Sequence, residues 1–316
     1  MATIVTLTMN PAVDVATTVP YVLPDRKLRC AAPRYEPGGG GINVARAIRR
    51  LGGDVVAWFP AGGAGGELLQ RLLRDEDVPH EALPVRGWTR ENVNVLEEVS
   101  HRQFRFCMPG AVLQGDEWPV FLERIEALAP APPYVVASGS LPPGAPVDFY
   151  ARLAAVARKL GSRLVLDSSG DALVAGAAAG VHLLKPSLRE FRALTGASED
   201  DESALIARAV AVVTERKWCE VLALSLGPAG ALLVSESVRA RLGAPAVPIA
   251  STVGAGDSMV AGMVLALARG RDLVEAARFG VAAGAAAVMN PGTELCHRGD
   301  VERLYSQVTV TPLAGS

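Results

Sequence analysis

An aspartate stands at the end of a short run of small residues near the C-terminus. Gly254, Ala255, Gly256 and Asp257 are separated by Ser258 alone from the apolar run 259–268, which is expected to be a helix. Small residues at a helix entrance let a ligand approach the unpaired first-turn amides, which attract anions. A simple helix cap would need only one Asp or Ser. The segment therefore predicts an anion hole at 254–256, with Asp257 as the general base that deprotonates an attacking hydroxyl.

A second segment of small residues opens a helix near the N-terminus. Four glycines at 38–41 are followed by Asn43. A dinucleotide-binding fingerprint is excluded because Asn43 occupies the place of its third glycine. A flexible linker is the alternative, but a helix follows at once. We expect the glycines to let a polyhydroxylated ligand lie against the backbone, with the Asn43 amide donating and accepting hydrogen bonds.

Charge and motif content exclude several function classes. The net charge of −2 is mixed along the 316 residues, which argues against a nucleic-acid partner. The apolar runs 173–184 and 279–289 are too short to span a membrane. The N-terminus has no signal-peptide pattern, so a cytoplasmic location is expected. None of the four lysines follows a glycine as in a Walker A motif, and GxSxG and HExxH motifs are missing.

The elements that must position these residues alternate between strands and helices. Apolar, β-rich runs at 3–8, 55–59, 134–137, 163–166, 181–184 and 221–226 are separated by helix-length segments such as 43–51, 67–75 and 147–160. This alternation predicts an α/β sandwich with a mostly parallel sheet and helices on both faces. Residues 27–36 and 82–107 alternate polar and apolar instead, which predicts a small antiparallel sheet outside the core or, alternatively, an edge of the main sheet.

Several motifs together resemble one known family. The segments GGGGINVARA, SGSLPPG, LDSSG, SLGPAGA and STVGAGDSM resemble the PfkB branch of the ribokinase-like sugar kinases, over nearly the whole chain. RKLRCAAPRYEPGGGG, GWTREN, FRFCMPGA and PGTELC resemble its type II 6-phosphofructokinases. The resemblance implies a single kinase domain over residues 1–316, a ribokinase-like α/β/α sandwich. It also implies a small β lid from about 11–37 and 82–110, through which two chains form a homodimer.

The resemblance also implies the reaction. Family members transfer the γ-phosphoryl group of Mg²⁺-bound ATP to a sugar hydroxyl, which here implies conversion of fructose 6-phosphate to fructose 1,6-bisphosphate. Asp257 would be the base, and the amides of Gly254, Ala255 and Gly256 the anion hole. Tagatose 6-phosphate and fructose 1-phosphate kinases remain alternatives because TMNPAVD also occurs in them. A sugar-phosphate sensor without turnover is the alternative from another class.

Substrate-binding residues follow from the same resemblance. For the sugar it selects Asp14, Gly39, Gly40, Asn43 and Ser140. For the sugar's phosphate, Arg90 and Arg105 are the candidates, with Lys27 and Arg29 contributing from the lid or across the dimer, since guanidinium groups bind phosphate bidentately. For ATP it selects Lys185, Ser187, Ser225, Gly227 and Thr252.

The resemblance finally implies two cation sites. Glu190 would hold hydrated Mg²⁺ through water, although the family's NxxE motif appears here with Ser187 in place of Asn, which weakens the expected magnesium affinity. A monovalent cation such as K⁺ would bind beside the anion hole. Its oxygens would come from Ser251, Val253, Ala287, Asn290 and Gly292.

Overall fold

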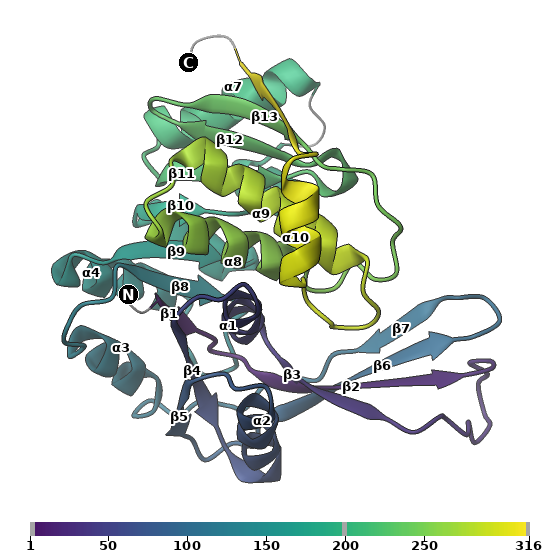
Figure 1. The fold of residues 1–316 in the computed structure, drawn as a ribbon. Helices are drawn as coiled ribbons and strands as arrows, with labels where there is room; N and C mark the ends of the chain where they lie inside the picture. The colour runs from purple at the N-terminus through teal and green to yellow at the C-terminus, as the bar shows by residue number, and fades with distance from the viewer. Residues whose placement is uncertain (1–3, 198–200, 314–316) are drawn as a thin grey trace.

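A ten-stranded sheet forms the centre of the computed structural model, which describes residues 4–197 and 201–313 (Figure 1). Its strand order is β14-β13-β12-β11-β10-β9-β8-β1-β4-β5. The seven neighbouring strands β5, β4, β1, β8, β9, β10 and β11 run parallel to one another. By contrast, β12 pairs antiparallel with β11, β13 with β12, and β14 with β13. The bounds are β1 Ile4–Leu7, β4 Val55–Ala61, β5 His80–Pro84, β8 Tyr134–Ser138, β9 Arg163–Asp167, β10 Val181–Leu184, β11 Cys219–Ser225, β12 Ala231–Ser235, β13 Arg239–Gly243 and β14 Thr309–Pro312.

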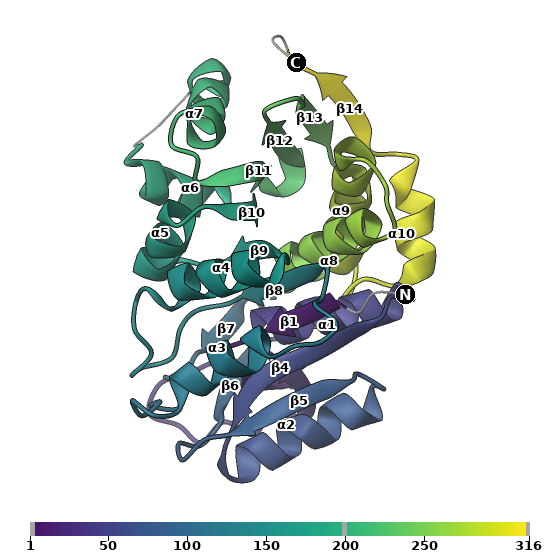
Figure 2. The ribbon, with the colours of Figure 1, turned by 90° about the vertical axis from the view of Figure 1, so that its left-hand side faces the viewer.

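Helices cover both faces of this sheet, which gives it two apolar cores. One face carries α1 (Gly40–Arg50), α2 (Gly63–Asp75), α8 (Ala255–Ala268), α9 (Leu273–Val288) and α10 (Arg298–Tyr305). The other carries α3 (Trp118–Glu126), α4 (Phe149–Leu160), α5 (Gly170–Ala178), α6 (Leu188–Thr195) and α7 (Glu202–Thr214), as Figure 2 shows. A short 3₁₀ turn, η1 (Gly227–Ala229), joins β11 to β12.

The predicted α/β/α sandwich is therefore confirmed. Each of the six predicted strand runs overlaps a strand of the large sheet, since most of their Val, Ile and Leu side chains are buried. The predicted helices 43–51, 67–75 and 147–160 correspond to α1, α2 and α4, with α1 and α2 beginning earlier at glycines. No helix in the described part of the chain is both long and apolar enough to cross a bilayer.

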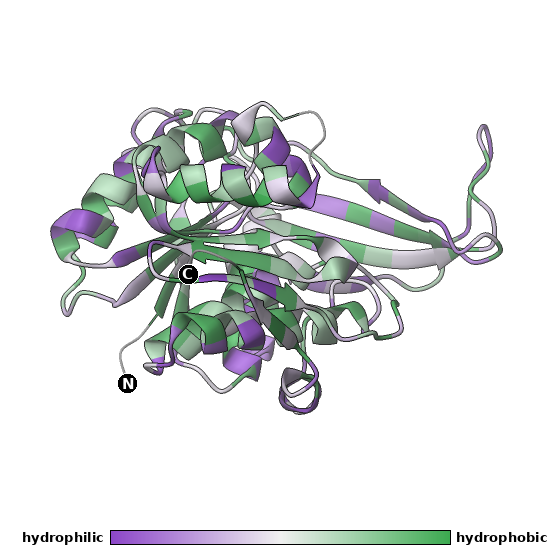
Figure 3. Ribbon diagram, turned by 90° about the horizontal axis from the view of Figure 1, so that it is seen from above, coloured by the Kyte–Doolittle hydropathy of each residue, from purple (hydrophilic) through white to green (hydrophobic). Residues whose placement is uncertain are grey.

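A separate four-stranded sheet extends from the sandwich as a lid (Figure 3). Its order is β3-β2-β6-β7, with β2 Ala12–Val19, β3 Arg34–Gly38, β6 Arg90–Glu97 and β7 Gln103–Phe106. Two expectations were wrong. The sheet is not purely antiparallel, because β2 and β6 pair in parallel. In addition, the start of the segment 82–110 belongs to β5, which pairs with β4 in the large sheet.

The carboxyl edge of the parallel strands gathers the predicted site. β8 ends at Ser138, β9 ends at Asp167, and Lys185 directly follows β10. The N-terminus of α8 approaches the same edge, because an added Cβ on Gly256 would lie 3.0 Å from the Lys185 Nζ. Ligands of open α/β sheets bind at this edge.

Candidate functional site

The entrance of α8 has the geometry of an anion hole. Gly254, the residue before the helix, has a left-handed φ of 76°, and a Cβ there would lie 2.5 Å from Leu295 Cδ2. The first helical hydrogen bond runs from the Ser258 amide to the Gly254 carbonyl, at 2.8 Å. The helix itself therefore offers no acceptor to the amides of Ala255, Gly256 and Asp257, which include two of the three residues of the predicted hole 254–256 and can bind an anion.

Asp257 lies in this first turn with its carboxylate held by Asn43. The Asn43 Nδ2 donates to Asp257 Oδ2 at 3.0 Å, and Asn43 belongs to α1. Burial raises the pKa of Asp257, while hydrogen bonding to Asn43 and the charge of Lys185 lower it. Burial dominates, so the pKa lies above the ordinary value of an aspartate. A carboxylate with a raised pKa is a better proton acceptor, as a general base requires.

The buried Arg46 fixes the orientation of the Asn43 side-chain amide. The Arg46 Nη1 donates to the Asn43 Oδ1 at 3.3 Å and to the Pro37 carbonyl at 2.9 Å, and its Nε donates to Glu76 at 2.8 Å. A guanidinium group can only donate hydrogen bonds, so the amide oxygen of Asn43 must face Arg46. The amide nitrogen of Asn43 consequently faces Asp257 and donates to its carboxyl oxygen.

The predicted sugar residues lie around Asp14, at the junction of lid and sandwich. Asn92 on β6 donates to Asp14 Oδ1 at 2.9 Å, and burial raises the pKa of Asp14. The backbone of the glycine segment approaches closely. A Cβ on Gly38 would lie 2.5 Å from Asp14 Oδ2, and one on Gly40 would lie 2.3 Å from Ser138 Oγ. A side chain at either position would collide with these groups, so the glycines are what allow the backbone to lie this close to Asp14 and Ser138.

Two further predicted sugar residues, Gly39 and Ser140, lie nearby. Gly39 caps α1 with a positive φ of 114°, directly before the helix that carries Asn43. Ser140 accepts a hydrogen bond from Asn10 at 3.1 Å. The structure thus links all the predicted sugar residues to the edge that carries Asp257.

The lid arginines differ in how many of their donors are occupied. Arg90 donates to the carbonyls of Met108 at 2.9 Å, Asn10 at 3.0 Å and Pro11 at 3.4 Å. Burial lowers the pKa of Arg90. Arg105 on β7 is exposed, and its charge is the first of three arginine charges that lower the pKa of Asp14. Arg90 therefore joins the lid to the sandwich, whereas Arg105 is open to a ligand.

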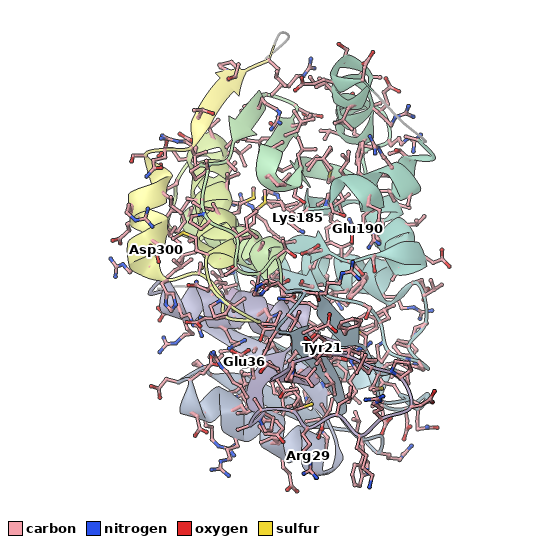
Figure 4. The ribbon with its side chains drawn as sticks, turned by 90° about the vertical axis from the view of Figure 1, so that its right-hand side faces the viewer. Tyr21, Arg29, Glu36, Lys185, Glu190 and Asp300 are labelled. Atoms are coloured by element: carbon pink, nitrogen blue, oxygen red, sulfur yellow. The ribbon has the colours of Figure 1, made fainter. Side chains whose placement is uncertain are left out.

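Lys27 and Arg29 are not brought to this site within one chain. Both are exposed and lie between β2 and β3, at the end of the lid furthest from the sandwich. Figure 4 shows Arg29 well away from Lys185 and Glu190. Within a single chain these two residues lie outside the predicted phosphate site.

A cavity of about 510 Å³ lies beside the α8 entrance. Ser225, Gly227, Thr252, Ala255 and Gly256 line it, together with an apolar wall formed by Pro245, Val247, Ile249, Met259, Val281 and Val288. A flat aromatic base can pack on such a wall while its polar groups reach the hydroxyls and backbone. The cavity therefore has the shape and chemistry of a nucleotide site.

Lys185 lies near this cavity but is already paired. Its Nζ is 3.1 Å from Asp167 Oδ1, and both groups are buried. Burial alone would lower the pKa of Lys185, but Asp167, Asp257 and Glu190 raise it. Burial raises the pKa of Asp167 to about 6, although Lys185 opposes this. Lys185 is thus held charged, 3.0 Å from the position of a Gly256 Cβ.

Ser187 and Glu190 form a reciprocal helix cap at the start of α6. The Glu190 carboxylate accepts from the Ser187 amide at 2.8 Å, and the Ser187 hydroxyl accepts from the Glu190 amide at 3.3 Å. No cluster of three or more His, Cys, Asp or Glu that could chelate a metal occurs within residues 4–197 and 201–313. One Glu190 oxygen remains for a metal-bound water, so the site suits an ion that arrives with its ligand and keeps its waters.

The predicted monovalent-cation residues gather in one cluster beside α8. The Ser251 hydroxyl donates to the Gly292 carbonyl at 2.7 Å, and the backbone N–H of Asn290 donates to the Ala287 carbonyl at 3.1 Å. Val253 donates its amide to Ser251 Oγ at 3.2 Å. The Asn290 Nδ2 donates to two other carbonyls, which leaves its Oδ1 available. These neutral oxygens suit a monovalent cation.

Sequence reasoning missed three residues of the site: Asp167, Arg46 and Ser138. Asp167 ends β9 in the strand next to the one that precedes Lys185, so strand adjacency was the available signal. Arg46 lies three residues after Asn43 on the same helix face, and a buried cation there could have been suspected from this spacing. Ser138 lowers the pKa of Asp257 by hydrogen bonding, and its sequence signal was its place at the start of the SGSLPPG motif.

Comparison with known proteins agrees with this geometry. The model of the "pfkB family carbohydrate kinase" matches residues 4–298. ATP-dependent 6-phosphofructokinase isozyme 2 of Escherichia coli K12 is 46% identical over 310 residues, covering 98% of this chain and 100% of that protein. The crystal structure of E. coli phosphofructokinase-2 with fructose-6-phosphate has a TM-score of 0.91 at 44% identity, covering 97% of this chain and 99% of that one. The structure of the E. coli enzyme with potassium has a TM-score of 0.92 at 45% identity and the same coverage. The chain belongs to the pfkB family of carbohydrate kinases.

Proposed function

We propose that this kinase transfers the γ-phosphoryl group of ATP to O1 of fructose 6-phosphate. One observation carries the mechanism: the Asp257 carboxylate accepts a hydrogen bond from Asn43 in the helix turn whose amides lack acceptors. The similarity to ATP-dependent 6-phosphofructokinases over nearly the whole chain supports the substrate. The sugar would bind between Asp14 and Asp257, and the nucleotide in the cavity beside α8.

Asp257 acts on the attacking hydroxyl. It accepts the O1 proton as the oxygen attacks the γ-phosphorus and the bond from that phosphorus to the β,γ-bridging oxygen breaks, which releases ADP. The amides of Gly254, Ala255 and Gly256 stabilise the charge on the phosphoryl oxygens. Phosphoryl transfer needs in-line alignment and charge neutralisation more than covalent participation, so one base and one anion hole suffice. Asn43 holds the carboxylate in position, and Asp14 accepts hydrogen bonds from the sugar's hydroxyls.

The phosphate of the sugar binds to the lid. Arg105 supplies exposed donors, and Arg90 retains two N–H groups beyond its three backbone contacts. Charge-assisted hydrogen bonds of this kind distinguish a phosphorylated from a neutral sugar. Lys27 and Arg29 reach a phosphate only from the lid of a second chain, because in their own chain they lie at the far end of the lid.

ATP binds with its base on the apolar wall and its hydroxyls near Ser225, Gly227 and Thr252. Lys185 faces the phosphates, and Ser187 lies near it after β10. Mg²⁺ would neutralise phosphate charge, with Glu190 contacting its bound water.

The oxygens of Ser251, Val253, Ala287, Asn290 and Gly292 would hold K⁺. A rise in melting temperature with K⁺, but not with tetramethylammonium, tests this cation site.

Two chains pair through their lids. The lid exposes large apolar side chains that a sandwich core does not cover, namely Tyr21, Leu23, Leu28, Tyr35, Phe106 and Met108. Exposed apolar groups that gather on one sheet are typical of an interface. Light scattering after size exclusion should give twice the chain mass, and F106E should reduce it toward one chain. A wild-type mass of one chain would contradict the pairing.

A coupled ADP-release assay with a panel of ketose phosphates tests the reaction. Fructose 6-phosphate should give the highest kcat/KM, ahead of tagatose 6-phosphate and fructose 1-phosphate. A reversed order would assign the site to one of those sugars. Binding of sugar phosphate and ATP without ADP release would indicate a sensor instead.

A further inference from the structure

A second cavity, of about 750 Å³, lies at the opposite edge of the large sheet. The amino ends of four neighbouring strands line it: Tyr134 of β8, Arg163 of β9, Val181 of β10 and Cys219 of β11. The turn from α8 to α9 also contributes to it, through Arg271. The carboxyl ends of the same strands carry the kinase site. The cavity and the kinase site therefore lie at opposite ends of the parallel strands.

Three arginines in this cavity have no carboxylate partner within residues 4–197 and 201–313. Arg158 donates only to the carbonyls of Ala179 and Gly180, at 3.2 and 3.3 Å. Arg163 donates to the Tyr134 hydroxyl at 3.0 Å. Arg271 lies over two aromatic rings. Most of their N–H groups are therefore available to a ligand.

The acidic groups that line the same cavity are already engaged. Glu220 is 2.8 Å from the His182 Nδ1, and Glu236 is 2.7 Å from the Lys217 Nζ. The Asp272 carboxylate caps α9 by accepting from the Glu275 amide at 2.8 Å. Each of these carboxylates thus has a donor of its own, and none of them forms an ion pair with the three guanidinium groups.

We propose that this cavity binds a small multivalent oxyanion, such as a phosphate- or carboxylate-bearing metabolite. A planar guanidinium group binds two oxygens of such an anion at once. The serine hydroxyls of Ser235 and Ser237, which also line the cavity, add neutral polar contacts. The cavity is large enough for a small metabolite of this kind.

This site is separate from the kinase site but directly connected to it by β9. Arg163 begins β9 and Asp167, the partner of Lys185, ends it. At about 3.3 Å per residue, their Cα atoms are about 13 Å apart. An anion here would not compete with either substrate, so its effect on the reaction would be regulatory.

Isothermal titration of the full-length protein with inorganic phosphate and, separately, with citrate tests the proposal. Fructose 6-phosphate and a non-hydrolysable ATP analogue are kept saturating, so that the anion holes of the kinase site are filled. We expect saturable binding with a Kd on the order of 0.1–1 mM for at least one probe. The probe that binds more tightly shows whether phosphate or carboxylate chemistry is preferred.

Variants connect the binding to the arginines. The double variant R163Q/R271Q should weaken binding about tenfold or more, because two charge-assisted contacts are lost. R71Q, an exposed arginine on α2 outside the cavity, is the matched control and should bind as the wild type. If the double variant does not fold, the anion affinity of the single variant R271Q is the deciding measurement. No saturable binding, or an affinity that R271Q and the double variant leave unchanged, would overturn the proposal.

Discussion

The carboxyl edge of the large sheet and the lid differ in how their functional side chains are held. At the edge, Asp257, Asn43 and Lys185 each contact a buried partner. On the lid, Arg105 is exposed, and large apolar groups are open to solvent. In the proposed function, the edge is therefore organised for proton and phosphoryl transfer before substrates bind, whereas the lid is completed by a ligand or a second chain.

This difference separates the kinetic constants that each region controls. Groups that act only in the transition state change kcat, whereas groups that bind substrate and transition state equally change KM. Substitutions at the edge should lower kcat, and substitutions on the lid should raise the KM of the sugar phosphate. The comparison fails if edge and lid variants have the same effect.

The largest effect is expected from D257N. Asparagine keeps the size of the side chain but cannot accept the hydroxyl proton, so kcat should fall about 10²–10⁴-fold. Affinity for ATP, measured by calorimetry, should stay within about threefold, since the α8 amides are unchanged. A kcat near the wild-type value would remove Asp257 from the role of base.

The next effect is expected from R105A on the lid. Loss of one charge-assisted contact should raise the KM of fructose 6-phosphate about 10- to 100-fold, with kcat changed little. R90A is the comparison, because it also breaks three backbone contacts. It should raise KM and lower the melting temperature together. If R105A leaves KM unchanged, Arg105 does not contact the phosphate.

A smaller effect is expected from R46K at the edge. Lysine keeps the charge beside Glu76 but cannot reach both Glu76 and the Asn43 amide oxygen. The Asn43 hydrogen bond lowers the pKa of Asp257, so weakening it raises that pKa.

The base is active when ionised, and activity is lost as pH falls through its pKa. In R46K the acid limb of the plot of kcat against pH should therefore move toward higher pH, and kcat at neutral pH should be several-fold lower. An unchanged pH profile would mean that Arg46 does not position Asn43. R49K is the control, because Arg49 is a half-buried neighbour on α1 whose side chain donates to the Asp77 carbonyl.

The sequence predicted the sandwich well because its strands are short apolar runs between Gly and Pro turns. It predicted the lid less well. Residues 82–84 begin the segment predicted to form the lid, but they end β5, which pairs in parallel with β4 in the large sheet. Which sheet a short strand joins depends on tertiary contacts, which local alternation does not encode.

The site shows the same limit. The run of small residues before Asp257 indicated a helix entrance and an anion hole from local pattern alone. The partners of its residues could not be found in this way. Arg46 and Asn43 are neighbours on one helix, but Asp257 is 214 residues further along the chain. Likewise Asp167 reaches Lys185 only because β9 and β10 are adjacent.

The smallest effect is expected from S187N, which restores the residue usual at this position of the family's NxxE motif. Asparagine caps helices as well as serine does, so the melting temperature should change by no more than about 2 °C. The added amide can reach a metal-bound water that the shorter serine cannot. The magnesium concentration for half-maximal activity should therefore fall about two- to fivefold. S187A is the matched control: it loses the cap to Glu190 and should lower stability by about 1 kcal/mol. If S187N leaves the magnesium dependence unchanged, Ser187 and Glu190 already organise the hydrated ion together, and the helix cap is then the reason that serine suffices at this edge.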